Sequence, residues 1–257
     1  MFMATANVLS IEGTNKGTVE LPKAFSEQVR QDLISRAVLA ERSYELQPQG
    51  HYPLAGMQTT ATYFGAMHSY RTGRHMGKAI RPREKLGGGV QGKVKRIPSA
   101  VKGKRAHPHV VEKILIERIN KREYQKALAS AISATARESP LVVEDKIEEI
   151  KRAREMVDIF NKLKLSSYLE QSRKPSIRKG LRRSSRIRHY KRSVLLVVSK
   201  ESPALKAARN IAGVDVCTVS TMRANLLAPG GNPGRIAVWS ESAIKHMDSA
   251  IEKYSLN

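Results

Sequence analysis

Residues 87–93, with the sequence GGGVQGK, come closest in this chain to a motif of known chemistry. A GxxxxGK loop followed by Ser or Thr cradles the phosphates of a nucleotide, and the hydroxyl helps to hold magnesium. Here Val94 stands in place of that hydroxyl, no strand pattern precedes the glycines, and Pro98 interrupts any helix that should follow. The sequence therefore argues against nucleotide hydrolysis at this loop.

Three other candidates for chemistry also fall short of a site. The turn PGGNPG at 229–234 comes before a strand pattern, so it lacks the helix N-terminus of a dinucleotide site and is either a structural turn or an RNA-contacting loop. The pair His107 and His109 has no carboxylate or cysteine set beside it to complete a metal site, and Cys217 in VDVCTV fits a packed core thiol. We expect no catalytic residue, no metal and no cofactor.

The formal net charge of +23 is the strongest physical signal in these 257 residues. Residues 51–107 hold twelve Lys and Arg with one acid, and residues 173–192 hold ten with none. The other 180 residues carry a net charge of only +2. Because such charge repels itself in a compact state, the pattern indicates a near-neutral folded body with two basic segments that face a polyanion.

The first basic segment, residues 51–107, is poor in side chains that build a core. Leu, Ile, Val and Phe supply eight of its 57 residues, and it contains nine of the seventeen glycines. Such a composition cannot usually bury a core of its own, and a long insertion of this kind is functional or disordered. A solvated linker is one interpretation. Cations interleaved with Tyr52, Tyr63, Phe64 and Tyr70 favour RNA, because cations neutralise phosphates and aromatic rings stack on unpaired bases.

The second basic segment, residues 173–192, reads RKPSIRKGLRRSSRIRHYKR. A nuclear-localisation-like run and a charged tail are alternatives for such a sequence. The segment runs directly into the strand pattern VLLVVS, which argues against a tail. Contact with phosphates is therefore the favoured role.

Cysteine usage and hydropathy exclude several classes of protein. One cysteine rules out a disulfide scaffold, and the opening MFMATANV shows no secretory signal pattern. The aliphatic run Val194–Val198 is five residues long, which is far too short to span a membrane. We expect a soluble intracellular protein.

The near-neutral body alternates strand patterns with helix patterns. We expect an N-terminal hairpin from residues 8–11 and 18–21, and a short strand at 142–143. Expected helices are 30–43, one that Pro108 opens, one that Asn120 and Glu123 begin as a capping pair, and a long one from Ile147 to Leu163.

The last third of the chain has the clearest pattern. Strands are expected at 194–199, 214–220 and 236–239, and each is followed by a helix; Ser202 and Ser240 cap the first and the last of these. Alternating strands and helices predict an α/β fold with a mainly parallel sheet flanked by helices, three-layered and Rossmann-like.

Five stretches together resemble the archaeal branch of the large-subunit ribosomal protein L-four (uL-four) family. They span nearly the whole chain in the family's order: LPKAFSEQVRQDLISRAVLAERS (21–43), PLAGMQTTAT (53–62), GKRAHP (103–108), INKREYQKALASAISATA (119–136) and APGGNPGRIAVWSESAI (228–244). The resemblance implies a structural, non-enzymatic constituent of the cytoplasmic ribosome that binds large-subunit ribosomal RNA. Neighbouring large-subunit proteins and the nascent peptide are its further partners, and no membrane is involved.

The resemblance also implies a division of the chain. Residues 1–44 and 108–257 form the globular domain, and residues 45–107 form an extended loop that enters the RNA and helps line the peptide exit tunnel. The implied loop tip is Tyr70, Arg71, Arg74, His75 and Lys78. The residues that we expect to bind RNA are Arg71, Arg74, Lys78, Arg81, Arg83, Lys85, Lys93, Lys95, Arg96, Lys102, Lys104, Arg105, Arg178, Lys179, Arg182, Arg183, Arg186, Arg188 and Lys191.

Two hypotheses of different classes follow. A structural RNA-binding protein accounts for the divided charge, the coreless insertion and the lack of an assembled active site. A nucleotide-using α/β enzyme with a basic substrate cleft is the alternative. The incomplete phosphate loop and the misplaced glycine turn both count against the enzyme.

Overall fold

The computed structural model describes residues 5–59, 61–62, 82–86, 91–94, 97–98, 103–136, 140–178 and 187–254. The chain divides into two units: a body, made of Met1–Glu45 and Ile116–Asn257, and a long loop, Leu46–Leu115. Among the described residues, no helix is long and apolar enough to cross a membrane.

The body is built on a six-stranded sheet with the strand order β10-β9-β11-β6-β1-β2. All neighbours are parallel except β1 and β2, which form the antiparallel hairpin at the N-terminal end. The strands are β1 (Thr5–Leu9), β2 (Asn15–Glu20), β6 (Leu141–Val143), β9 (Val194–Val198), β10 (Asp215–Thr218) and β11 (Ile236–Ser240). The sheet confirms the mainly parallel α/β class that the alternating pattern predicts.

Strand β9 shows why this sheet must be covered on both faces. All five of its residues are buried. Leu195 and Val197 pack into one apolar cluster, whereas Val194, Leu196 and Val198 pack into a second. Because successive side chains of a strand point to opposite faces, an unbroken apolar run requires an apolar layer on each side.

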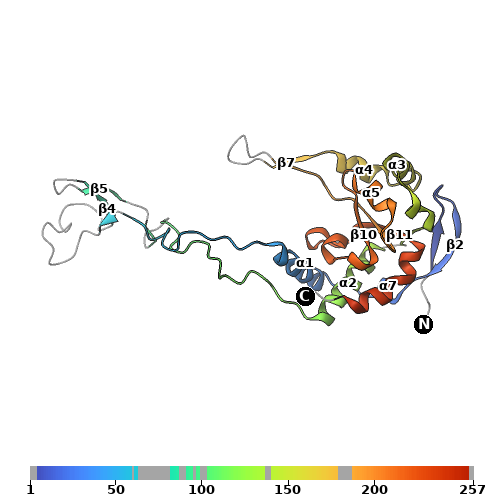
Figure 1. Ribbon diagram of the computed structural model, residues 1–257, viewed down its shortest axis with the longest axis horizontal. Helices are drawn as coiled ribbons and strands as arrows, with labels where there is room; N and C mark the ends of the chain where they lie inside the picture. Colours follow the sequence, from blue (N-terminus) through green and yellow to red (C-terminus); the bar gives the residue numbers. More distant parts are fainter. Residues whose placement is uncertain are drawn as a thin grey trace. The chain divides into compact units, whose positions relative to one another are not determined.

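Helices supply both of these layers (Figure 1). The first cluster contains residues of α1 (Gln31–Glu45), α2 (Lys121–Thr135), α6 (Ala224–Leu227) and α7 (Glu241–Lys253). The second contains residues of the short 3-10 helix η3 (Asp145–Glu149) and of α3 (Ala153–Lys162), α4 (Ser166–Arg173) and α5 (Pro203–Arg209). Three further 3-10 turns are η1 (Lys23–Ser26), η5 (Val219–Thr221) and η6 (Pro229–Gly231).

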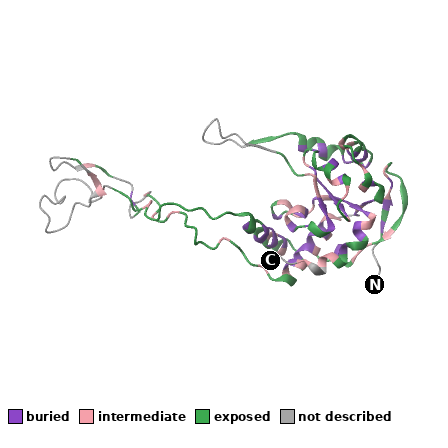
Figure 2. Ribbon diagram, viewed as in Figure 1, coloured by how far each residue is buried: buried purple, intermediate pink, exposed green. Residues whose placement is uncertain are grey.

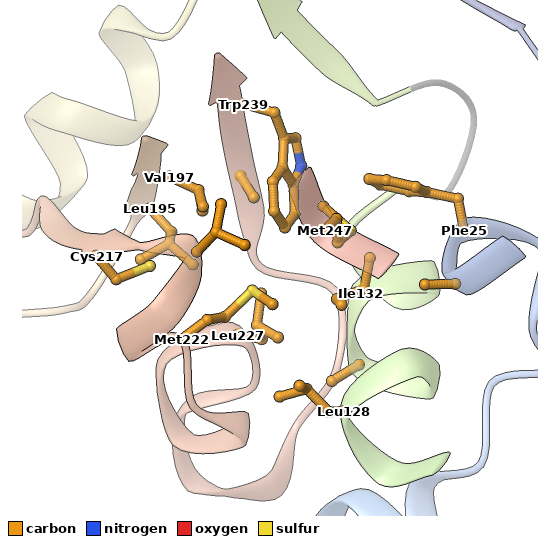
Figure 3. Close-up of a cluster of buried hydrophobic side chains, with 14 of the residues drawn as sticks. Phe25, Leu128, Ile132, Leu195, Val197, Cys217, Met222, Leu227, Trp239 and Met247 are labelled. Atoms are coloured by element: carbon orange, nitrogen blue, oxygen red, sulfur yellow. The ribbon is translucent and has the colours of Figure 1, made fainter. Parts of the chain in front are cut away.

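Trp239, from β11, is the largest side chain buried in the first cluster (Figure 3). Its ring meets that of Phe25 edge to face, with 5.4 Å between the ring centroids and 78° between the ring planes. Cys217, from β10, lies in the same cluster, and burial raises the pKa of its thiol to about 12. The prediction of a packed core thiol is therefore confirmed, because a thiol with this pKa remains protonated and unreactive at neutral pH.

The long helix predicted from Ile147 to Leu163 is wrong, because the structure divides this stretch into η3 and α3. The carboxylate of Glu148, in η3, accepts hydrogen bonds from the backbone N–H of Ser199 at 2.9 Å and from the hydroxyl of Ser240 at 2.7 Å. These tertiary contacts and the burial of Ile147 hold η3 against the ends of β9 and β11. The helix begins anew only after the extended residues 150–152, so tertiary bonding overrides the helical periodicity.

Helix capping follows the prediction at one position and departs from it at two. Ser202 precedes α5, but its side chain makes no capping bond. The side chain of Ser240 accepts a hydrogen bond from the backbone N–H of Ala243 at the start of α7, as predicted. Asn120 precedes α2, but its side chain makes no capping bond. Glu123 instead pairs with Arg36 of α1 at 2.8 Å, so it joins two helices rather than closing the end of one.

Glu41 is a buried carboxylate that connects three helices of the first layer. It accepts hydrogen bonds from the hydroxyl of Tyr124 in α2 at 2.6 Å, and from the backbone N–H groups of Ala224 and Asn225 at the start of α6 at 2.7 and 2.8 Å. Burial and the nearby Glu41 charge raise the pKa of Tyr124, so its hydroxyl stays a donor throughout the physiological range. Glu41 thereby ties α1 to α2 and α6 within the same layer.

Replacement of Glu41 by alanine should therefore destabilise the body. Three donors would lose their acceptor inside the protein, and we expect a loss of about 2–4 kcal/mol in the free energy of unfolding. The control is Glu45→Ala, at an exposed position of the same helix, which should change stability by less than about 0.5 kcal/mol. Urea unfolding monitored by circular dichroism measures both, and equal stabilities would mean that the Glu41 bonds contribute nothing net.

Candidate nucleic-acid interface

The long loop begins and ends as two chain segments that run alongside each other. The backbone N–H of His51 donates to the carbonyl oxygen of His109 at 3.1 Å, and Lys104 Nζ donates to the carbonyl oxygen of Gln58 at 3.2 Å. Between them, a Cβ on Gly56 would lie 2.1 Å from the carbonyl oxygen of Arg105. Only glycine permits this approach, so the pairing depends on a residue without a side chain.

The described residues of the long loop form almost no core. They include three short antiparallel strands, β3 (Ala61–Thr62), β4 (Arg83–Lys85) and β5 (Gln91–Val94). Ile97 is the one buried apolar residue among them. Figure 2 shows residues 46–59 and 103–115 almost entirely exposed, and their exposed apolar side chains are Leu46, Tyr52, Leu54, Met57, Val110, Val111 and Ile114. The protein by itself leaves this surface in water.

The helix expected to open at Pro108 is wrong, because residues 108–120 contain no helix. Ile114 is 87% exposed and Val111 is 57% exposed, so these two residues of the apolar spacing have no core to face; only Ile119, at its end, packs against the first cluster. An isolated short helix is marginal in water, and the β-branched residues of this stretch lower its helix propensity further. The stretch instead forms one side of the long loop, where a Cβ on Gly50 would lie 3.0 Å from Val111 Cγ2.

The incomplete phosphate loop ends in a strand. Gly92 and Lys93 lie within β5, which pairs with β4. A phosphate loop requires the N-terminus of a helix at this point, because the first backbone N–H groups of the helix bind the phosphates. In the described part of this loop no such helix follows the glycines.

At the carboxyl edge of the parallel sheet, where α/β enzymes bind nucleotides, the ends of β9 and β11 are taken up by a carboxylate of the protein itself, Glu148. Besides Ser199 and Ser240, Glu148 accepts a hydrogen bond from the hydroxyl of Ser242 at 3.1 Å. A carboxylate placed at these strand ends repels phosphate, and its acceptor oxygens are already saturated with protein donors. In the described part of the chain, no three His, Cys, Asp or Glu side chains gather as metal ligands would. These observations count against the nucleotide-using enzyme.

The second basic segment leaves the body as a two-stranded ribbon of β7 (Ser176–Arg178) and β8 (Ile187–His189). At its base, the hydroxyls of Ser172 and Ser193 share a hydrogen bond of 3.2 Å. These two serines directly flank residues 173–192, and the Ser172 side chain is fully buried. The ribbon is therefore fastened to the body at both of its ends.

A serine fastens the long loop at both ends as well. The buried hydroxyl of Ser43 donates to the carbonyl oxygen of Ala40 and accepts from the backbone N–H of Glu117 at 2.9 Å. Residues 43 and 117 lie just outside the two limits of the long loop. Neutral hydrogen bonds thus contribute at the base of both basic segments, and at the ribbon Arg192 adds an ion pair with Asp215 at 3.6 Å.

Arg235 fixes the amino ends of the central strands beside the ribbon. Its buried guanidinium donates to the carbonyl oxygens of Ser193, Val194 and Leu226 and pairs with Asp215 at 2.7 Å. Burial lowers the pKa of Arg235, and the Asp215 charge opposes that shift. Sequence reasoning missed this residue. The available signal was a single arginine placed directly before a buried strand.

The predicted RNA-binding residues within the described part lie largely at the surface. Lys93, Lys104, Arg105 and Lys191 are exposed, and Arg83 is half-buried. Lys85, Arg178 and Arg188 are described only by their strand backbone, in β4, β7 and β8. The remaining predictions lie outside the described residues, and these are the five tip residues Tyr70, Arg71, Arg74, His75 and Lys78, and also Arg81, Lys95, Arg96, Lys102, Lys179, Arg182, Arg183 and Arg186.

A near-neutral three-layer α/β body with two basic segments, whose described residues lie largely at the surface, defines an α/β protein built to contact a polyanion. A family model described as the Ribosomal protein L4/L1 family matches residues 19–250, and the chain belongs to this family. The chain is 40% identical to a Methanococcus vannielii protein named large ribosomal subunit protein uL4, over 93% of this chain and 97% of the relative. A protein of the same name from Archaeoglobus fulgidus is 38% identical over 94% of this chain and 97% of its own length. Another from Methanococcoides burtonii is 40% identical over 96% of this chain and 98% of its own length. The resemblance to the archaeal branch is thereby confirmed.

The base of the ribbon provides a direct test of this arrangement. Gly213 has a φ of +80°, and a Cβ there would lie 2.2 Å from Ser172 Cβ and 2.7 Å from the carbonyl oxygen of Lys191. We expect Gly213→Ala to reduce the free energy of unfolding by about 2–4 kcal/mol through strain and overpacking. Gly17→Ala is the control, because nothing lies within 4 Å of an added Cβ at that position. Thermal melts compare the two, and similar melting temperatures would show that the body does not constrain the ribbon here.

Proposed function

We propose that this protein is a structural constituent of the large ribosomal subunit and binds large-subunit ribosomal RNA. The observation that carries the proposal is the long loop, which exposes cations and apolar side chains along its described length and is fastened to a folded body at both ends. Membership of a ribosomal protein family supports the same partner. The fold acts as a platform for the two basic segments, and the chain is not an enzyme.

Electrostatics explains why the body folds while the two basic segments bind RNA. Lys and Arg side chains bind RNA by neutralising phosphates and releasing condensed counterions. A body with a net charge of about +2 folds without strong self-repulsion, while the segments carry +21 to where RNA can neutralise it. Exposed Tyr52 and Met57 have no protein partner layer, and RNA bases and sugars are surfaces that could cover them.

The finer assignment follows the family resemblance. Residues 45–107 are proposed to enter the RNA and help line the peptide exit tunnel, with the tip at Tyr70, Arg71, Arg74, His75 and Lys78 facing the nascent peptide. Residues 1–44 and 108–257 are proposed as the globular domain, which meets neighbouring large-subunit proteins in the cytoplasmic ribosome. The basic residues of both segments predicted to contact RNA keep that proposed role.

Sedimentation and binding at graded salt test the proposal first. Each phosphate neutralised contributes a slope of roughly −0.7 to −0.9 in log affinity against log salt. If a third of the 22 segment cations engage, the slope for purified protein on large-subunit RNA should reach a magnitude on the order of 5 or more. The protein should also co-sediment with large subunits at moderate salt. An affinity nearly independent of salt would contradict the proposal.

Deletion of Tyr52–Lys104 tests the long loop separately. Because neither apolar cluster of the body contains a described residue of the loop, a short Gly/Ser bridge between residues 51 and 105 should leave the body folded. Shortening a flexible loop also lowers its closure entropy, by roughly 0.6 kcal/mol per halving of length. Cells that depend on the shortened protein should assemble large subunits poorly or with an altered tunnel wall.

Thermal melts of the shortened protein test whether the body still folds. Gradient profiles of those cells test whether large subunits assemble. A collapsed melt would mean that the loop belongs to the core of the body. Normal assembly of large subunits with an unchanged tunnel would mean that the loop is only a linker.

A further inference from the structure

A cavity of about 300 Å³ lies at the base of the ribbon, on the amino side of β9 and β11. Three parts of the body form its wall: the exposed side of α4, residues 191–193 after the ribbon, and the glycine-rich turn that continues from η6 into β11. The side chains that matter for its chemistry are Tyr168, Gln171, Lys191, Arg192, Asn232 and Arg235. We call this cavity the root pocket.

The root pocket carries a positive charge at its mouth and a fixed cation in its wall. Lys191 and Arg192 are exposed. Arg235 is held in place by three backbone carbonyl oxygens, so its guanidinium keeps one position. The carboxylate of Asp215 lies 2.7 Å from Arg235 Nη1 and 3.6 Å from Arg192 Nε. Its negative charge offsets one of the three positive charges, which are those of Lys191 and these two arginines. The remaining charge attracts an anion.

The other walls of the root pocket suit a planar base better than a bare anion. Tyr168 is 43% exposed on α4 and presents an aromatic ring to solvent. Gln171, also exposed, and Asn232 add amide groups that can donate and accept hydrogen bonds. Besides Asn232, the turn lines the pocket with Pro229, Pro233 and Gly234, which add no charge. Aromatic stacking together with amide hydrogen bonds is the usual means of holding an unstacked RNA base.

We propose that the root pocket holds one unpaired nucleotide of the bound RNA, with its base against Tyr168 and its phosphate at Lys191 and Arg192. This inference rests on the proposed function and adds a specific site to it. The volume is at the lower end of ligand pockets, which suits a single nucleotide rather than a duplex. The ribbon would then approach the RNA backbone while the pocket fixes its position at one extruded base.

The experiment uses the full-length protein and large-subunit RNA transcribed in vitro. Tyr168→Ala should weaken binding about tenfold, which corresponds to about 1.4 kcal/mol, while the salt slope stays unchanged because no charge is lost. Tyr168→Phe keeps the ring and should bind as the original protein does. Lys191→Gln should instead lower the magnitude of the salt slope by about 0.8.

The matched control is Tyr190→Ala. Tyr190 is 52% exposed and close to Lys191 in the chain, but it does not line the root pocket, so its loss should change affinity less than twofold. Circular dichroism checks that each variant is folded. Equal binding by Tyr168→Ala and the original protein, or equal losses at Tyr168 and Tyr190, would overturn the inference.

Two further measurements separate the possible outcomes. Calorimetric titration with each of the four nucleoside 5′-monophosphates should show no saturable binding below millimolar concentration, and micromolar binding would point to a free nucleotide instead of RNA. A density map of the protein in place on the large subunit should show one base against Tyr168, and an empty pocket would overturn the inference. If the original protein fails to prefer large-subunit RNA over an unrelated RNA of equal length, the proposed function itself is contradicted.

Discussion

Repulsion among like charges is the constraint on which this structure depends. Twenty-two cations in 77 residues cannot be packed into a core, since burial of unpaired charge costs far more than folding can supply. The chain meets this constraint by keeping the basic residues out of the two apolar clusters on either side of the sheet. The near-neutral remainder can then fold by ordinary hydrophobic burial.

The points of attachment follow from the same constraint. A salt bridge at the base of a basic segment would consume a charge intended for the partner. Neutral groups supply most of the bonds at the segment bases: Ser43 with the Glu117 backbone, and Ser172 with Ser193. Arg192 is the exception, since it pairs with Asp215 at 3.6 Å. The charged groups that stabilise these regions, Glu41 and Arg235, belong to the body and are satisfied mainly by uncharged donors and acceptors. Apart from Arg192, the charged groups named here as structural therefore belong to the body.

The sheet is used differently here from the way an α/β enzyme uses it. In such enzymes the carboxyl ends of the strands open into the ligand site. Here Glu148 occupies the ends of β9 and β11 with hydrogen bonds to Ser199, Ser240 and Ser242, and the cavity of about 290 Å³ that remains beside β10 is lined by no Lys or Arg. The open, positively charged cavity lies instead at the amino ends, beside the ribbon and the turn before β11. The same architecture therefore serves as a support for RNA-binding segments.

The local sequence determined most of the body and the location of its charge. The apolar run of β9, the Ser240 cap of α7 and the strands of the last third are local patterns, because each depends on the spacing of a few adjacent residues. The resemblance to a ribosomal family rested on contiguous motifs of the same kind. Only the tertiary structure decided where a helical spacing of apolar residues had no continuous helix to match. Val111 and Ile114 have helical spacing but no core to face. The stretch Ile147–Leu163 is interrupted where Glu148 bonds to strand ends about 50 and 90 residues away in the chain. The serines at the segment bases and the root pocket were likewise beyond prediction, because each joins residues that only folding brings together.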